Sequence, residues 1–199
     1  MTGTPRSDPP EDKAAIRAAA LARRDALAAD HHAHAARALA DHAGGIGWHP
    51  GNIVSGFWPI RSEIDPRPLM EALAARGAII ALPAVIDRQT IVFRRHDKAV
   101  PLVPGGFGTM APGPDAKPLD PDLMLIPLSA FDDGGNRIGY GAGHYDRAIA
   151  RLVAKGRTPR LVGLAFECQR VNRVPAEPHD VPLHTVLTEN GLQALPAQR

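Results

Sequence analysis

A chain of 199 residues with 44% hydrophobic residues is long enough to bury one ordinary core, so we expect a single domain. Its 23 basic and 21 acidic residues are interspersed, which argues against a nucleic-acid-binding surface. No apolar run reaches the roughly 18 residues of a membrane span. From the charge pattern and the short apolar runs together, we expect neither a nucleic-acid nor a membrane partner.

The N-terminal segment, residues 1–12, is polar and rich in proline and contains no secretory signal, so we expect it to be disordered and the protein to be cytoplasmic. The single cysteine, Cys168, excludes an internal disulfide and any zinc site built from several cysteines. We interpret it as a small, buried apolar residue that follows a strand.

Alternating patterns of helix and strand run through the rest of the chain. Apolar spacing and end signals predict helices over residues 11–30, 31–45 (ending at Gly44 and Gly45), 65–77 and 144–156. Short apolar runs predict strands over residues 52–58, 78–85, 90–95, 123–131 and 160–166, and the Pro/Gly-rich stretch 100–120 predicts a long loop. Strands that alternate with helices and are apolar throughout indicate an α/β fold whose parallel sheet is covered on both faces.

The stretch RIGYGAGHYDR, residues 137–147, follows an apolar strand and opens a helix. A helix N-terminus favours an anion, and the glycines at every second position leave the backbone bare for a phosphate. Arg137 and Arg147 can add positive charge, and Asp146 can hold a magnesium ion. The spacing matches neither of the common nucleotide-binding glycine motifs, so the stretch alone is equally compatible with a flexible connection.

The same stretch, written GNRIGYGAGHYDR after a strand that ends in FDDGG, resembles the signature of the 5-formyltetrahydrofolate cyclo-ligase (5,10-methenyltetrahydrofolate synthetase) family. Three further segments resemble the family in order and spacing: KAAIRAAALARRDAL, GFWPIRSEIDPRPLMEALAARGAIIALPAV and VPAEPHDVPLHTVLTENGL. The resemblance extends from about Lys13 to Leu192. The chain departs from the family at His144, where a tyrosine is usual, and at Ala111, where a glutamate often precedes the proline.

The resemblance implies ATP-dependent conversion of 5-formyltetrahydrofolate to 5,10-methenyltetrahydrofolate, with ATP and Mg²⁺ required and no side chain acting as a nucleophile. It also implies that residues 13–195 form one domain and that the protein is a monomer. The implied fold has three layers, α/β/α, around a Rossmann-like, mainly parallel sheet of the NagB/RpiA/CoA-transferase type. The residues implied for ATP are Lys13, Arg17, Arg137, Ile138, Gly139, Tyr140, Gly141, Ala142, Gly143, His144 and Tyr145. Those implied for the folate are Trp58, Glu63, Tyr140 and His144, and those for magnesium are Asp146 and Asp180.

The chemistry of these residues fits those roles, although each residue alone has an ordinary explanation. Lys13 and Arg17 are four apart on a helix, so their side chains leave one face and can hold a polyphosphate together, but they could also form a solvated basic face. Glu63 stands just past a strand end and could instead cap the next helix. Asp180 could simply form a turn.

Other functions compatible with the pattern are a sugar-phosphate isomerase or deaminase, a non-catalytic folate- or nucleotide-binding paralogue, and a nucleic-acid binder. The basic pair on the first helix favours a triphosphate over a sugar phosphate. Four histidines lie close together in the sequence, but no recognised zinc motif includes them, and we expect a solvated helix face there: His31, His32, His34 and His42.

Overall fold

A computed structural model describes residues 12–177 and 180–196 of the chain. Its four α-helices are α1 (Lys13–Asp25), α2 (Ala29–Asp41), α3 (Arg67–Ala75) and α4 (His144–Ala154). One sheet has the strand order β12-β11-β10-β7-β1-β2-β3-β6. The bounds of these strands, in that order, are Gly191–Ala194, Thr185–Thr188, Arg160–Leu164, Leu123–Pro127, Ile53–Ser55, Ile79–Val85, Ile91–Arg95 and Pro118–Leu119.

The centre of this sheet is parallel. Five consecutive strands pair in parallel with one another: β11, β10, β7, β1 and β2. Antiparallel strands extend the sheet at its two edges, β12 beside β11 at one edge and β3 followed by β6 at the other. The predicted α/β class with a mainly parallel sheet is therefore confirmed. The C-terminal hairpin of β11 and β12 was not predicted from the sequence.

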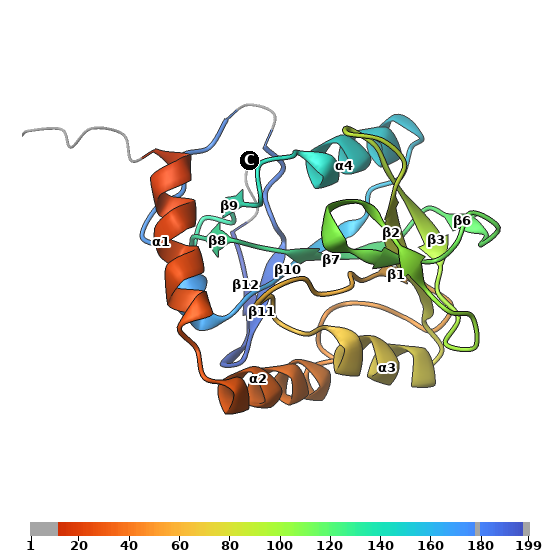
Figure 1. The fold of residues 1–199 in the computed structure, drawn as a ribbon, viewed down its shortest axis with the longest axis horizontal. Helices are drawn as coiled ribbons and strands as arrows, with labels where there is room; N and C mark the ends of the chain where they lie inside the picture. Colours follow the sequence, from red (N-terminus) through yellow and green to blue (C-terminus); the bar gives the residue numbers. More distant parts are fainter. Residues whose placement is uncertain (1–11, 178–179, 197–199) are drawn as a thin grey trace, which may run out of the picture.

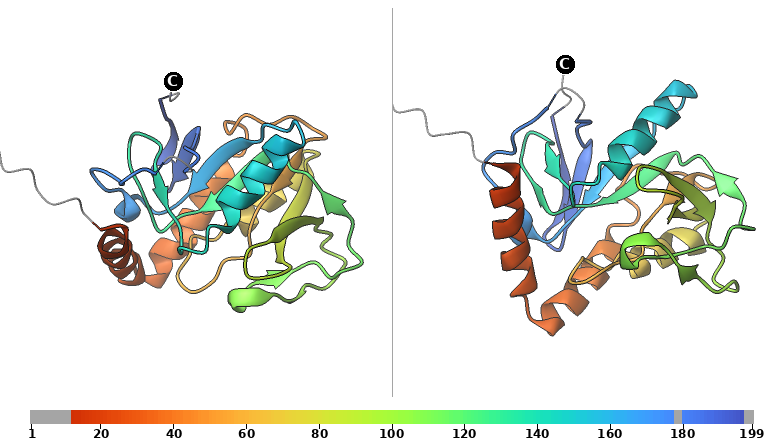
Figure 2. Two further views of the ribbon diagram at one scale, coloured as in Figure 1. Left: turned by 90° about the horizontal axis from the view of Figure 1, so that it is seen from above. Right: turned by 45° about the horizontal axis from the view of Figure 1, so that its top comes forward.

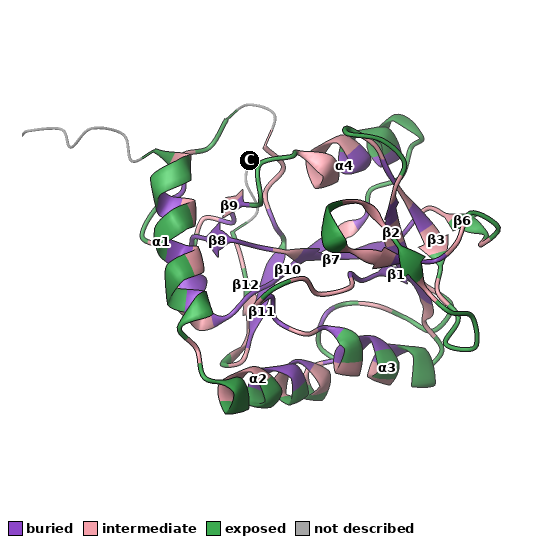
Figure 3. Cartoon of the chain, viewed as in Figure 1, coloured by how far each residue is buried: buried purple, intermediate pink, exposed green. Residues whose placement is uncertain are grey.

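Helices cover both faces of the sheet, as Figure 1 shows, with α2 and α3 on one face and α4 on the other. Strand β7 explains the arrangement, because its side chains alternate between two cores. Leu123 and Leu125 pack into the core beneath α2 and α3, whereas Met124 and Ile126 pack into the core beneath α4. Each fully buried aliphatic side chain of this kind stabilises the fold by about 1.5–3 kcal/mol, and the central strands are buried along their length (Figure 3).

Helix α1 stands apart from the two helical layers and packs on a small hairpin of β8 (Ala130–Phe131) and β9 (Arg137–Ile138), as the two views of Figure 2 show. Asp12 caps its first turn by accepting a hydrogen bond from the Ala14 N–H at 3.1 Å. Ile16 and Ala20 form its buried stripe against the hairpin. Because β9 forms the first two residues of the glycine stretch (residues 137–147), this packing places α1 beside that stretch.

Several element limits differ from those predicted, and the expected disordered segment 1–12 lies outside the described residues except for Asp12. The first helix ends at Asp25, and the second ends at Asp41 rather than at Gly44 and Gly45. Strand 52–58 shortens to β1, and strand 123–131 is broken after Pro127 into β7 and β8. The expected loop 100–120 contains β4 (Val103–Pro104), a 3₁₀ turn (Gly106–Gly108), β5 (Met110–Ala111) and β6. For the strands, pairing with segments distant in the sequence decides these limits, and local patterns do not contain that information.

Candidate active site

The glycine stretch lines a cavity of about 330 Å³ at the carboxyl end of β7, where Ile126 and Pro127 form part of its wall. This is the edge at which α/β sheets bind ligands. Every residue that the sequence assigned to ATP or magnesium lines this cavity: Lys13, Arg17, residues 137–146 and Asp180. The structure therefore brings together segments that are up to 167 residues apart in the sequence.

At two positions of the glycine stretch the backbone has a positive φ, a conformation that favours glycine over other residues. Gly141 has a φ of +95° and Gly143 a φ of +62°, both in the left-handed region that side chains disfavour. Gly143 is also the N-cap of α4, and no side chain caps that helix. The first N–H groups of α4 are thus left for an anionic ligand, with the helix dipole in their favour.

Two cations reach the cavity from α1. The Lys13 Nζ lies 2.7 Å from Oδ2 of Asp180 and 3.3 Å from Oε1 of Glu177. Burial alone would lower the pKa of Lys13, but the bonds to these two carboxylates outweigh it and raise the pKa, so the amine stays charged. The Arg17 Nε donates a hydrogen bond to the carbonyl oxygen of Gly139 at 2.7 Å, which fixes the guanidinium against the glycine stretch.

The two acids assigned to magnesium both line the cavity, and each contacts a cation. Asp146 lies in the first turn of α4, and its Oδ1 is 2.5 Å from Nη2 of Arg137, whose side chain is 8% exposed. Asp180 is the partner of Lys13. Within residues 12–177 and 180–196, no group of three or more His, Cys, Asp or Glu side chains could hold a metal ion. Two carboxylates still fit Mg²⁺, which usually takes one or two from the protein and completes its shell with water and phosphate oxygens.

Glu63 lies behind the glycine stretch and lines neither of the two cavities described for this region. Its side chain is buried, and its Oε2 accepts a hydrogen bond from the Ile60 N–H at 2.9 Å. Burial raises the pKa of Glu63, and the Ile60 bond, the Arg24 guanidinium and the Tyr140 hydroxyl oppose that rise. Tyr140 therefore connects Glu63 to the cavity, whose lining includes Tyr140.

Arg24 is a part of the site that sequence reasoning missed. Its side chain is 2% exposed, and it donates hydrogen bonds from Nε to Ser62 Oγ at 2.9 Å and from Nη2 to the Tyr140 hydroxyl at 3.0 Å. Arg24 thus links two segments: the loop that contains Ser62 and Glu63, and the glycine stretch that contains Tyr140. A signal was present in the sequence: Arg24 continues the i, i+4 spacing of Ile16 and Ala20, which places it on the buried stripe of α1.

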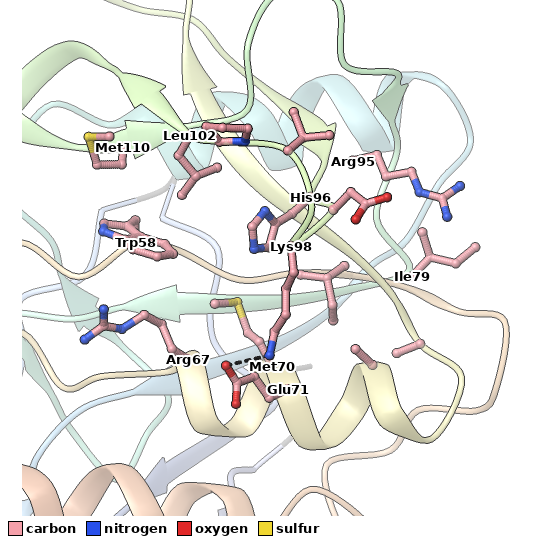
Figure 4. Close-up of a pocket in the computed structure, with 16 residues that line it drawn as sticks. Trp58, Arg67, Met70, Glu71, Ile79, Arg95, His96, Lys98, Leu102 and Met110 are labelled. Carbon is pink, nitrogen blue, oxygen red and sulfur yellow. Dashed lines mark ion pairs between the residues drawn. The ribbon is translucent and has the colours of Figure 1, made fainter.

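The residues assigned to the folate do not share one cavity. Tyr140 and His144 line the cavity of the glycine stretch, but Trp58 lines a second cavity of about 760 Å³ (Figure 4). The His144 ring lies 5.5 Å from the ring of Phe107, a residue that the sequence did not single out. Phe107 is 65% exposed and has a φ of +60°, a strained conformation for an aromatic residue. Ala111 is buried in β5 and lines neither of these two cavities.

The histidine-rich helix α2 differs in part from its expected solvated face. His34 is exposed as predicted, but His31 and His32 are half-buried, with rings 5.8 Å and 4.7 Å from the ring of Phe166.

Cys168 is only partly buried and lies in a 3₁₀ turn rather than directly after the strand, so the prediction made for this cysteine was also inaccurate. Burial raises the pKa of the Cys168 thiol, which makes it a poor nucleophile.

The fold and cavity are those of an α/β protein with a glycine-lined cavity, bordered by both cations and carboxylates, at the carboxyl edge of its sheet. Among the described residues, no helix has the length and apolar character needed to cross a bilayer. A model of the 5-formyltetrahydrofolate cyclo-ligase family matches residues 9–189, and the chain belongs to that family. The resemblance seen in the sequence is thereby confirmed.

Individual relatives agree with the family assignment. The chain is 32% identical over 137 residues to 5-formyltetrahydrofolate cyclo-ligase of Haemophilus influenzae, which is 66% of this chain and 72% of the relative. It is 32% identical over 141 residues to the Escherichia coli K12 protein of the same name, covering 68% of this chain and 76% of that protein. The solved structure of Aquifex aeolicus 5,10-methenyltetrahydrofolate synthetase superposes with a TM-score of 0.74 at 26% identity, covering 94% of both chains.

Proposed function

We propose that this chain catalyses the ATP-dependent conversion of 5-formyltetrahydrofolate to 5,10-methenyltetrahydrofolate, with release of ADP and phosphate. Family membership and the names of its relatives support the reaction. The single observation that carries the assignment of residues is the convergence of α1, the glycine stretch and Asp180 on one cavity. We further propose that the protein acts in the cytoplasm as a monomer, with small-molecule ligands only.

The binding roles follow from the charges and backbone around the cavity. Lys13, Arg17 and the N-terminus of α4 would hold the triphosphate, since three sources of positive potential face the same space. Arg137 would add to that potential while it holds Asp146 in place. A magnesium ion bound by Asp146 and Asp180 would neutralise the phosphate oxygens.

The reaction requires a formamide, a poor electrophile, to be activated. The formyl oxygen attacks the γ-phosphorus of ATP, an O–P bond forms, and ADP leaves. The N10 nitrogen then attacks the formyl carbon, and the C–O bond breaks with loss of phosphate and of the N10 proton. No side-chain nucleophile is needed, so the protein contributes positioning and charge neutralisation. Glu63, Tyr140 and His144 would orient the folate at the edge of the cavity.

The test is the absorbance of 5,10-methenyltetrahydrofolate in a mixture of the protein, ATP, Mg²⁺ and 5-formyltetrahydrofolate. We expect product to form only when all three additions are present, with one ADP released per product. Binding of both ligands without product would instead identify a non-catalytic paralogue. Absence of binding by either ligand would overturn the proposal.

A further inference from the structure

Arg147 ends the glycine stretch without lining its cavity. From the sequence we expected its charge to face a phosphate, but the part of α4 that lines the cavity ends at Asp146. Arg147 instead contacts the hairpin of β2 and β3, which packs beside α4 (Figure 1). Its Nε donates a hydrogen bond to the carbonyl oxygen of Gln89, in the turn of that hairpin, at 2.8 Å. The guanidinium is therefore bound to a backbone carbonyl outside the cavity.

The same guanidinium also holds the backbone of the glycine stretch. Its Nη2 donates a hydrogen bond to the carbonyl oxygen of Ala142 at 2.5 Å. A Cβ at Gly143 would lie 2.8 Å from Nη1 of Arg147, so the guanidinium lies directly beside the N-cap of α4. One side chain thus connects the glycine stretch to Gln89, a residue 58 positions before Arg147 in the sequence.

The bond to Ala142 sets the direction of a backbone N–H. No cis peptide bond occurs among the described residues, and a planar trans peptide directs its C=O and its N–H to opposite sides. Because Arg147 holds the Ala142 carbonyl oxygen, the N–H of Gly143 in the same peptide unit points away from the guanidinium. Ala142 and Gly143 line the cavity and Arg147 does not, so this N–H is directed to the side on which the cavity lies.

The turn between β2 and β3 is itself held in shape. Oδ1 of Asp87 accepts hydrogen bonds from the N–H groups of Gln89 at 2.7 Å and of Thr90 at 2.8 Å. A second arginine of α4 also contacts this hairpin, since Nη2 of Arg151 donates a hydrogen bond to the carbonyl oxygen of Ile91 at 2.7 Å. The hairpin is thus a firm support for α4, and Arg151 contacts it without lining the glycine cavity.

We propose that Arg147 is a positioning residue for the triphosphate, which bridges Gln89 and Ala142 and thereby presents the Gly143 N–H to a phosphate oxygen. The proposal rests on the proposed function, which places the triphosphate against the glycine stretch. A cation that attracted the phosphate directly would face the cavity, whereas Arg147 donates its hydrogen bonds to two backbone carbonyl oxygens. Its contribution is a backbone already ordered for the ligand, which lowers the entropy cost of binding.

Three variants separate this role from charge attraction and from general stabilisation. Arg147→Met removes both hydrogen bonds, and Arg147→Lys keeps the charge but replaces the planar guanidinium with a single ammonium group. Arg151→Met is the matched control, because it loses a similar bond between α4 and the hairpin away from the cavity. Neither arginine is buried, so the variants should fold.

Both Arg147 variants should weaken ATP binding about three- to tenfold, the loss expected for one backbone hydrogen bond. Arg151→Met should leave ATP binding unchanged. The measurement is calorimetric titration of each variant with ATP and Mg²⁺ and, separately, with 5-formyltetrahydrofolate, with a thermal melt to check folding. We expect the Kd and the KM of ATP to rise together for the Arg147 variants, while the Kd of the folate stays constant.

Three results would overturn the inference even if turnover is observed. ATP binding that Arg147→Met weakens and Arg147→Lys preserves would show charge attraction. An equal loss in Arg151→Met would show a general effect of the hairpin contact, and unchanged ATP binding in both Arg147 variants would show no role. The expected order of Kd values in a protein without turnover would support the role of Arg147 and overturn the proposed reaction instead.

Discussion

Gly141 gives the sharpest test of the phosphate site. Its φ of +95° lies in the left-handed region, where a side chain adds about 1–2 kcal/mol of strain. A Cβ built there would lie 3.6 Å from Nη2 and 3.8 Å from Cζ of Arg17, so it would fit without a clash. The methyl group of Gly141→Ala would therefore occupy the space between the glycine stretch and the guanidinium.

A phosphate held by both groups needs that space. A phosphate oxygen that accepts a hydrogen bond from Arg17 sits about 2.9 Å from the nitrogen, within contact of the added methyl group. We expect Gly141→Ala to lose at least one charge-assisted bond, about 1.5–3 kcal/mol or roughly 10- to 150-fold in the Kd of ATP. The strain should also lower the Tm by about 2–8 °C.

The matched control is Gly156→Ala, at the end of α4. Gly156 has a φ of +75°, and a Cβ there would have no atom within 4 Å, so the strain is similar but the cavity is untouched. Thermal melts should show comparable losses of Tm for the two variants, and calorimetry should show weakened ATP binding only for Gly141→Ala. If the folded Gly141→Ala protein binds ATP as tightly as the unmodified chain, the glycine stretch does not hold the phosphates.

Three further substitutions probe the charges of the site. Asp146→Asn should lower kcat strongly and weaken Mg²⁺ binding in the presence of ADP; it also leaves Arg137 buried without an anion, so the free energy of unfolding should fall by about 1–3 kcal/mol. An unchanged kcat at saturating Mg²⁺ would contradict the assignment. Lys13→Ala combined with Arg17→Ala should raise the Kd of ATP far more than that of the folate, and equal losses would indicate a structural role for α1. Glu63→Gln should raise the KM for the folate yet increase stability at pH 7 and not at pH 4. Burial raises the pKa of Glu63 in the folded state above the 4.5 of the unfolded state. Between these two pKa values the folded state binds more protons than the unfolded state, so the free energy of unfolding falls as the pH rises through that range. A pH-independent stability difference would refute this reasoning.

The central layers of the fold were predictable because they depend on local patterns. The apolar run 123–131 and the alternation of strands with helices indicated a parallel sheet, and β7 shows why: its residues must be apolar on both faces. The edge strands were harder to predict. β12 and β6 depend on a partner strand for their existence, and their own sequences are short and mixed.

The residues of the glycine stretch were predictable because a motif and a helix spacing point to the same place. Lys13 and Arg17 share a helix face, and the structure brings that face to the cavity. The sequence did not indicate that the residues assigned to the folate would fail to share one cavity, because Trp58 and Glu63 come from one loop whose path no local pattern specifies. Phe107 was missed for the same reason, since its strained φ and its contact with His144 exist only once the long segment between β3 and β7 is folded.

Arg24 explains how two loops without regular structure can form a defined site. Arg24 is 1% exposed, so its guanidinium N–H groups can find acceptors only within the protein, and each N–H that finds one avoids the cost of an unsatisfied buried donor, about 1–3 kcal/mol. Ser62 Oγ accepts from Nε and the Tyr140 hydroxyl accepts from Nη2, whereas Nη1 is buried without a hydrogen-bond partner, so two of the three guanidinium nitrogens connect α1 to these loops. Arg24 thus holds both loops from behind the cavity, and Arg17 adds a hydrogen bond to the Gly139 carbonyl oxygen on the cavity side. If Lys13 and Arg17 bind a triphosphate as proposed, the two hydrogen bonds from Arg24 to these loops can remain in place, because they involve neither Lys13 nor Arg17.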